Sequence, residues 1–374
     1  MKVIIAGSYQ TRFGELWERS LLSLLMEAGQ GAMKDAGVQA SEIDLVVVGN
    51  KLGGRISEQD HLGALMADKL RVKGRGIRVE AACASGGIAV HQAVQAIKTG
   101  EAETVLVLGG EKMTDKNNGV VGAALMGAAS EEERRTGLSF VGLYALMARA
   151  YMEKFGARRR DLAKVAVKNH KQASLNPKAQ FPREITEEMA LKAIMVAEPL
   201  GLFDCSPISD GAAGLVVRGV KTKKAGKREV EILASEIATD SLGLNERESL
   251  LEIKATKEAA GRAYVSAGVG PEEIDIMEVH DCFTIAEILA LEDLGFCKKG
   301  EGFKGIDKPV NLSGGLKACG HPVGATGVKQ MVELTHHLRR EAGERQADKA
   351  DMGLAHNVGG TGGTAVVHIL KGSI

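Results

Sequence analysis

The chain has little of what marks proteins that bind nucleic acid or lie on membranes. Among its 374 residues, lysine and arginine total 48, aspartate and glutamate total 48, and aromatic residues make up 3%. Without a net positive charge, the protein has no overall field that would attract nucleic acid or an anionic membrane surface. We therefore expect neither nucleic acid nor a membrane among its partners.

Long hydrophobic runs are also lacking. Apolar segments such as 45–48 and 105–108 are far too short to cross a bilayer, and the apolar start of the chain is shorter than the core of a secretory signal. The apolar content of 44% is nevertheless ample for a packed core. We expect a globular cytoplasmic protein.

Paired cysteines are missing as well. The five cysteines are odd in number, and C-x-x-C spacing is absent among them; they stand at positions 83, 205, 282, 297 and 319. This pattern argues against both a disulfide framework and a zinc ribbon. We expect reduced thiols and no bound metal.

What the chain does have is an alternation of short apolar strands with helical segments. Residues 3–6, 44–48 and 104–108 are predicted as strands, and residues 20–36 and 58–70 as helices. Strands that are apolar throughout indicate a sheet covered by helices on both faces. The sequence predicts an α/β fold whose sheet is mostly parallel.

Residues 113–200 lack this rhythm. Helical stretches at 139–155 and 160–173 follow polar, small-residue segments, which predicts a loop domain lying over the strand ends, where α/β proteins bind ligands. Two basic segments lie here, 158–160 and 168–171. They form either a solvated helix face or a contact with a phosphorylated ligand.

The second half of the chain repeats the first. Ala-Gly-Val at 36–38 and Glu-Ile-Asp at 42–44 recur at 267–269 and 273–275, at a constant offset of 231 residues. Such a match in register indicates a duplicated domain. We predict an N-terminal half at 1–112 completed by 201–222, a loop domain at 113–200 and a C-terminal half at 223–374.

Cys83 occupies a distinctive local position. A strand-like segment from Ile77 ends in small residues, and a helix-compatible segment from Ala89 to Lys98 follows. A cysteine on such a turn lies near the free N–H groups of the helix, whose partial positive charge favours the thiolate. For a lone cysteine, the interpretation as a small buried residue in a tight corner is favoured.

The duplication indicates where partners of Cys83 would lie. After strands of the second half stand His-Asp-Cys-Phe at 280–283, a histidine- and glycine-rich segment at 319–327 and His-Asn-Val-Gly-Gly at 356–360. Each segment alone could be ordinary core or turn. Together they gather nucleophiles, bases and close-approach glycines at one edge of the fold.

These segments together resemble the thiolase family. The resemblance is carried by Ala-Cys-Ala-Ser-Gly at 82–86, His-Asp-Cys-Phe at 280–283, Gly-His-Pro-Val-Gly-Ala-Thr-Gly at 320–327 and His-Asn-Val-Gly-Gly at 356–360. The His-Asp-Cys-Phe segment is similar to that of sterol-carrier-protein-type thiolases and archaeal acetoacetyl-CoA thiolases. The resemblance implies two duplicated α/β halves in five αβαβα layers, with the loop domain inserted.

The resemblance also implies an acetyl-CoA C-acetyltransferase that supplies the mevalonate pathway, with roles for five residues. Cys83 is the nucleophile that carries the acetyl group, and His321 is its general base. Cys282 exchanges the Cα proton, His280 holds a water at the enolate oxygen, and the backbone N–H groups of Cys83 and Gly359 bind the oxyanion. Acetyl-CoA, acetoacetyl-CoA and CoA are the implied substrates, and no separate cofactor is implied.

Several alternatives stay open at this point. They are a degradative 3-ketoacyl-CoA thiolase of other chain length, a ketoacyl synthase or hydroxymethylglutaryl-CoA synthase, a dinucleotide-binding dehydrogenase and an inactive scaffold. Cys282 argues against the other condensing enzymes, which do not use a second cysteine as acid and base. Residues 5–10 lack the Gly-x-Gly-x-x-Gly pattern of a dinucleotide-binding dehydrogenase. Cys319, beside His321, has no assigned role.

The family also implies partners. Thiolases generally form homodimers or homotetramers through the sheet edge at the nucleophile's strand, here 77–82, which would otherwise be an unprotected edge. Archaeal members are known to assemble with hydroxymethylglutaryl-CoA synthase through a small OB-fold, zinc-ribbon protein. Both assemblies are expectations for this chain.

Overall fold

A single run of paired strands connects the two halves of the protein. The computed structural model describes residues 1–221, 229–304 and 308–373, and its main sheet has the order β3-β2-β4-β7-β1-β8-β11-β10-β9. The two halves join at β1 and β8, where Ile4 pairs with Glu231 and Ile5 with Val230. The strands are β1 (Lys2–Gln10), β2 (Leu45–Gly49), β3 (Arg75–Val79), β4 (Thr104–Glu111), β7 (Gly211–Val220), β8 (Val230–Thr239), β9 (Ile276–Glu278), β10 (Met352–Gly359) and β11 (Thr364–Gly372).

The prediction of a mostly parallel sheet is wrong. β2 is parallel to β3 and β4, and β9 is parallel to β10. The pairs β4/β7, β7/β1, β1/β8, β8/β11 and β10/β11 are antiparallel. Apolar runs report burial on both faces of a strand, and antiparallel strands between two helix layers give the same pattern.

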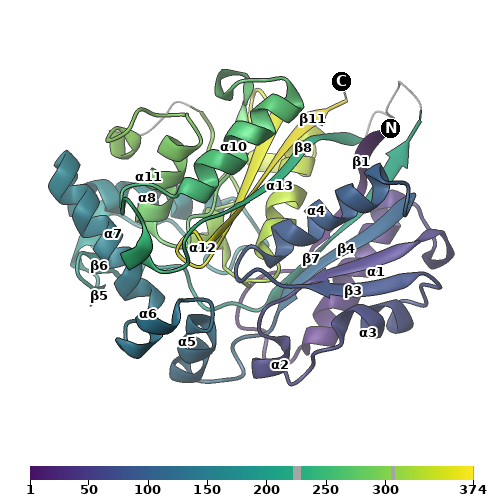
Figure 1. Cartoon of the computed structure of the whole chain (residues 1–374), viewed down its shortest axis with the longest axis horizontal. Coiled ribbons are helices and arrows are strands. Elements are labelled where there is room, and N and C mark those ends of the chain that lie inside the picture. The colour runs from purple at the N-terminus through teal and green to yellow at the C-terminus, as the bar shows by residue number, and fades with distance from the viewer. Residues whose placement is uncertain (222–228, 305–307, 374) are drawn as a thin grey trace.

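Helices complete the five predicted layers (Figure 1). α1 (Leu21–Ala36) and α3 (Leu62–Lys69) cover the outer face of the N-terminal half, and α10 (Lys254–Ala267) and α11 (Thr284–Asp293) pack on the outer side of the C-terminal half. α4 (Ser85–Lys98) and α13 (Thr326–Leu338) pack against each other between the two sheet halves. Their apolar side chains form a shared central core with β4, β7 and β10.

The repeated sequence motif has the same structural task in both halves. Gly37 and Gly268 end α1 and α10 with φ angles of 66° and 68°, a left-handed conformation that glycine adopts without strain. The repeated aspartates Asp44 and Asp275 precede β2 and β9, and each accepts two backbone N–H bonds at the start of the strand paired with its own, β4 for Asp44 and β10 for Asp275. The repeat therefore encodes one helix-to-strand connection, used twice.

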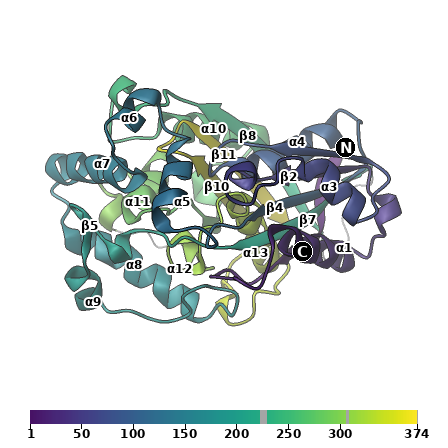
Figure 2. The same ribbon diagram turned by 90° about the horizontal axis from the view of Figure 1, so that it is seen from below.

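The region between β4 and β7 is mainly helical. It lies at the opposite end of the molecule from α1 and α3 in both views (Figures 1 and 2). α7 and α8 pack against α11 of the C-terminal half. The elements are α5 (Asn118–Met126), α6 (Glu131–Arg135), α7 (Phe140–Phe155), α8 (Arg159–Ser174), α9 (Glu187–Lys192) and the short strands β5 (Met195–Ala197) and β6 (Leu200–Gly201).

The predicted helix at 58–70 is shorter than expected, since α3 begins at Leu62 and the short helix α2 (Gly53–Ile56) precedes it. The predicted boundary between residues 222 and 223 lies outside the described residues. The limits of the loop domain stay a prediction. Within the described part of the chain, every helix is too short or too polar to span a membrane.

Glycines let the N-termini of α4 and α13 touch. A Cβ on Gly86 would lie 2.8 Å from the carbonyl oxygen of Gly324, and a Cβ on Gly327 would lie 2.2 Å from the backbone nitrogen of Gly87. Real Cβ contacts are essentially never this short, so a side chain at either position would push the two helices apart. The residues before both helix starts belong to the candidate site.

We expect Gly327→Ala to destabilise the protein by about 1–3 kcal/mol, because its Cβ would meet backbone on the facing helix. Gly261→Ala is the matched control: Gly261 lies inside α10, is exposed and has no atom within 4 Å of a Cβ. That control should gain about 0.5–1 kcal/mol from helix propensity. Urea unfolding followed by circular dichroism measures both, and equal stabilities of the two variants would contradict the close-contact argument.

Candidate active site

Cys83 lies on the turn between β3 and α4. Ala82 has a φ of 52°, an uncommon conformation for a residue with a Cβ, and it makes the chain turn sharply before the cysteine. The Ser85 hydroxyl stabilises this turn, accepting from Ala81 N at 3.0 Å and donating to Ala82 O at 2.6 Å. The turn directs the Cys83 thiol into a cavity rather than into the core.

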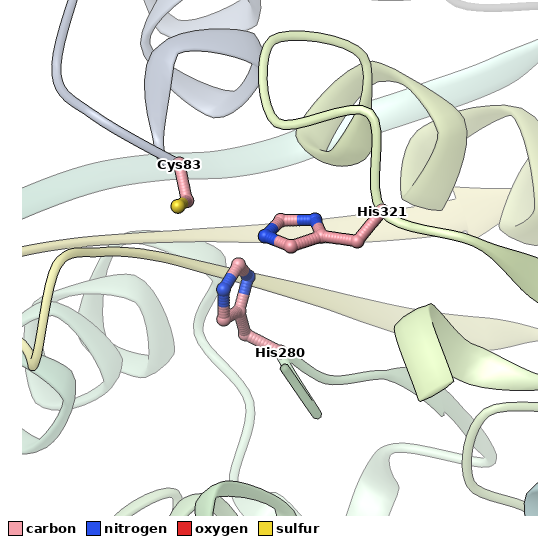
Figure 3. A group of neighbouring side chains, drawn as sticks. All are labelled: Cys83, His280 and His321. Carbon is pink, nitrogen blue, oxygen red and sulfur yellow. The ribbon is translucent and has the colours of Figure 1, made fainter. Parts of the chain in front are cut away.

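His321 follows α12 (Gly315–Cys319) and points its ring toward Cys83 (Figure 3). Its Nδ1 lies 2.7 Å from the Thr326 hydroxyl, and that hydroxyl in turn donates to the Pro322 carbonyl at 3.2 Å. A hydroxyl has one proton, so Thr326 accepts the Nδ1 proton of His321. Nε2 is then unprotonated, which makes His321 a base aimed at the cysteine.

His280, which follows β9, has the opposite tautomer. Asn357 accepts from the backbone N–H of Gly87 at 3.0 Å through its Oδ1, so its amide nitrogen is the donor to Cys83 O at 3.0 Å and to His280 Nδ1 at 3.1 Å. The proton of the neutral His280 ring must therefore be on Nε2. This N–H is buried and has no partner within the described chain, which suits a donor waiting for a substrate oxygen.

The same three side chains have the chemistry of metal ligands. The sulfur of Cys83 and ring nitrogens of His280 and His321 lie within 4.8 Å of one another. A metal would need an unprotonated Nε2 on His280, however, and Asn357 keeps the proton there. The residues do not fit a metal ion, and the arrangement is that of a nucleophile, a base and a hydrogen-bond donor.

Burial keeps all of these groups neutral. It raises the pKa of Cys83 to about 11, although Lys51 and the N–H of Gly360 act in the other direction. Burial also lowers the pKa of His321 to about 3, lowers that of His280 well below its usual value and raises that of Cys282 well above its usual value. The prediction that Cys83 is a thiolate is therefore wrong for the free protein. The cost of burying a charge raises the pKa of the thiol by more than the partial charge of the helix N-terminus lowers it.

Cys282 and Cys83 line one cavity of about 280 Å³. Much of its wall comes from the region 113–200, which the sequence indicated as a whole without identifying individual residues, and residues 205–208 beyond that region add to the wall. Cys319 is fully buried outside this cavity, beside Gln10 and Asn176. The lining residues are Cys83, Met113, Asn118, Gly122, Leu125, Ser139, Phe140, Val141, Tyr144, Cys205, Ser206, Pro207, Ile208, Cys282, Phe283, His321, Val323 and Gly360.

The expected oxyanion donor is displaced by one residue. Gly359 is the last residue of β10, paired with Thr364 of β11, and it packs against Ala81 rather than lining the cavity. Gly360 begins the following turn with a φ of 63°, and its backbone N–H is hydrogen-bonded to the Cys83 sulfur. The strand ladder occupies Gly359 and leaves the amide of Gly360 free to face the nucleophile.

The basic segments predicted in the loop region are partly used within the protein. The ammonium group of Lys168 pairs with the buried carboxylate of Glu287, and Arg160 pairs with Glu187. These two contacts favour a structural role for those cations over binding of a phosphorylated ligand.

Comparison with known proteins gives a consistent result. Residues 3–221 match the family model described as the N-terminal domain of thiolase, and residues 237–372 match the one described as thiolase C-terminal domain-like. The chain is 45% identical to the acetyl-CoA acetyltransferase of Methanothermobacter thermautotrophicus, covering 99% of both chains. It is 33% identical to sterol carrier protein 2 of Bos taurus, with 99% of this chain matching 72% of that protein.

A solved structure is also similar over the whole length. The structure described as Ltp2-ChsH2(DUF35) aldolase superposes with a TM-score of 0.86 at 25% identity, covering 100% of this chain and 98% of that chain.

The neutral state of Cys83 has a measurable consequence. We expect the rate of Cys83 alkylation by iodoacetamide to rise about tenfold per pH unit through neutrality and to level off near the pKa of about 11, since the thiolate is the reactive form. Peptide mass spectrometry identifies the labelled residue, and buried Cys319 should stay unlabelled as an internal control. A rate that is already constant at neutral pH would mean a resting thiolate.

Proposed function

The chain belongs to the thiolase family and is an acyltransferase, and on this basis we propose that it interconverts two acetyl-CoA with acetoacetyl-CoA and CoA. One observation carries the proposal. The Cys83 thiol, the unprotonated Nε2 of His321 and the Cys282 thiol share one cavity, beside the unpartnered N–H of His280.

The first half-reaction acetylates Cys83. His321 Nε2 takes the thiol proton as the sulfur attacks the thioester carbonyl of acetyl-CoA. The C–S bond to CoA breaks, and the leaving CoA takes a proton from Cys282. The enzyme then holds acetyl-Cys83, protonated His321 and a Cys282 thiolate, with no net change in charge.

The second half-reaction forms the carbon–carbon bond. The Cys282 thiolate removes a Cα proton from a second acetyl-CoA, and the resulting enolate attacks the acetyl carbon on Cys83. Acetoacetyl-CoA leaves as the bond to the Cys83 sulfur breaks, and His321 returns its proton to that sulfur. All three groups are then back in their neutral starting state.

Two sets of donors support the charges that develop. The N–H of His280 faces the reacting groups, directly or through a water, and suits the enolate oxygen. The N–H of Gly360, already bonded to the Cys83 sulfur, suits the oxyanion of the tetrahedral intermediate together with the N–H of Cys83. The low polarity of the buried site makes each of these hydrogen bonds stronger than it would be in water.

Acetyl transfer is proposed over longer chains because the relative at 45% identity is named acetyl-CoA acetyltransferase. A degradative role on longer 3-ketoacyl-CoA substrates is the alternative. Steady-state rates across a series of 3-ketoacyl-CoA chain lengths distinguish the two, since acetoacetyl-CoA should have the highest kcat/KM.

The proposal extends to partners and location. β3 is an edge strand with Ile77 38% exposed, which supports pairing of two copies along this edge. The solved neighbour that joins Ltp2 to ChsH2(DUF35) supports an assembly with an accessory protein, here the small OB-fold, zinc-ribbon protein and hydroxymethylglutaryl-CoA synthase. Condensation of two acetyl-CoA is uphill, so such a cytoplasmic complex would draw the product onward into mevalonate synthesis.

The two thiols should behave differently when removed. Cys83→Ala should abolish thiolysis of acetoacetyl-CoA, followed as loss of its enolate absorbance, because the acyl group has no carrier. Cys282→Ala should still form acetyl-Cys83, because the leaving CoA thiolate can take its proton from water instead of Cys282. It should condense at least about a hundredfold more slowly, because the Cα proton lacks an acceptor. Intact-protein mass spectrometry would show the trapped acetyl-enzyme.

Cys319→Ala is the matched control for Cys282→Ala, since Cys319 is buried outside the cavity and its loss should cost stability but not either half-reaction. Normal turnover by Cys282→Ala would contradict the assignment of the proton acceptor.

The proposed assembly is tested on the protein with all 374 residues present. Light scattering should give the mass of a dimer or tetramer, and co-purification from the native host should bring down the synthase. A monomer would contradict pairing along β3. Co-purification of β-oxidation enzymes without the synthase would favour the degradative role.

A further inference from the structure

Tyr144 is a buried tyrosine that faces the reacting groups from the inserted region. It lies on α7, is 1% exposed, and its ring packs on that of Phe283 with 4.6 Å between centroids. Its hydroxyl donates to the carbonyl oxygen of Gly360 at 3.0 Å. Tyr144 and Cys282 line the same cavity, and the hydroxyl is close enough to the Cys282 thiol to interact with it. The tyrosine therefore contacts both the acid/base thiol and the turn whose N–H faces Cys83.

A phenol hydroxyl has one proton and can also accept a hydrogen bond, so its two contacts cannot both receive that proton at once. While Cys282 is a thiol, the hydroxyl donates to Gly360 O and can accept the weak S–H donor. When Cys282 becomes a thiolate, the same hydroxyl can rotate and donate to the sulfur. A hydrogen bond to a charged acceptor is about twice as strong as a neutral one, so the rotation favours the thiolate.

We propose that Tyr144 is a positioning residue that stabilises the thiolate of Cys282 by redirecting its hydroxyl proton from Gly360 to the sulfur. This inference rests on the proposed function only in the role given to Cys282. The property at issue is the proton affinity of the Cys282 thiol, which can be measured whether or not the enzyme turns over.

The surroundings of Cys282 leave this role to Tyr144. The other ionisable groups facing the thiol are Cys83, from the turn before α4, and Asp281, its own neighbour, and negative charge on either disfavours a second negative charge. The carboxylate of Asp281 is held by the N–H groups of Leu316 and Lys317. The positive charge of Arg247 lowers the pKa of Tyr144, and the Arg247 guanidinium donates a hydrogen bond to the carbonyl oxygen of Thr361. The backbone N–H of Phe283 also favours the thiolate, and it is present whatever residue stands at position 144. Among the side chains, Tyr144 is the hydrogen-bond donor to the sulfur.

The test measures Cys282 reactivity in a Cys83→Ala background, where no acyl-enzyme can form. We expect Tyr144→Phe to lower the rate of Cys282 alkylation by iodoacetamide about tenfold to a hundredfold at each pH below the thiol's pKa, because the thiolate loses a donor. Tyr151→Phe is the matched control. Tyr151 lies on the same helix, is fully buried and hydrogen-bonds to Glu292 rather than to the site, so it should leave the rate unchanged.

A second variant keeps the proposal falsifiable if Tyr144→Phe folds poorly in a thermal melt. A 3-fluorotyrosine at position 144 keeps both contacts with a more acidic phenol, and it should raise the alkylation rate. Equal rates with and without the Tyr144 hydroxyl, or an equal loss in Tyr151→Phe, would overturn the inference. Failure of the proposed function would look different, as an enzyme without thiolysis whose Cys282 alkylation still responds to Tyr144.

Discussion

The contact between the N-termini of α4 and α13 is the constraint on which the site depends. Cys83 comes just before α4 in one half of the protein, and His321 comes just before α13 in the other. Gly86 and Gly327 allow the two helix starts to approach so closely that a side chain at either would clash with backbone. Asn357 then connects the groups across this contact, because its one amide bonds to Gly87, Cys83 and His280.

Desolvation sets the chemistry that this geometry permits. The same burial that brings the side chains together holds the two thiols and the two histidines in their neutral forms. A reactive thiolate therefore arises when a thioester is in place and a proton moves, not in the resting protein. Such a site protects its cysteines from adventitious oxidation, since oxidation requires thiolate character.

The sequence alone predicted the family, the duplication and four of the candidate side chains, and the comparisons confirm the family and the fold. Cys83, His280 and Cys282 could be found because each lies between a strand and the helix that follows it, and His321 because it lies in a recognisable segment before α13. Tyr144 could not, because a helix pattern does not say which buried residue of α7 faces a cavity built by a distant loop. The predictions of a mostly parallel sheet and of a Cys83 thiolate were wrong for a related reason. Strand direction and the pKa of Cys83 both depend on residues that are remote in the chain.

The division of the reacting groups between the two halves gives the protein an early point of failure. Within the described residues, the halves are connected in the sheet by two residue pairs between β1 and β8. Packing of α4 and α13 and hydrogen bonds such as those of Asn357 and Arg339 add to this connection. We call this contact between the two halves the seam. A hinge-like opening of the seam would separate the nucleophile Cys83 from the base His321 while every helix and strand stayed intact. Catalytic competence thus reports on the rigidity of the seam, and heat or denaturant should silence the enzyme before its secondary structure melts.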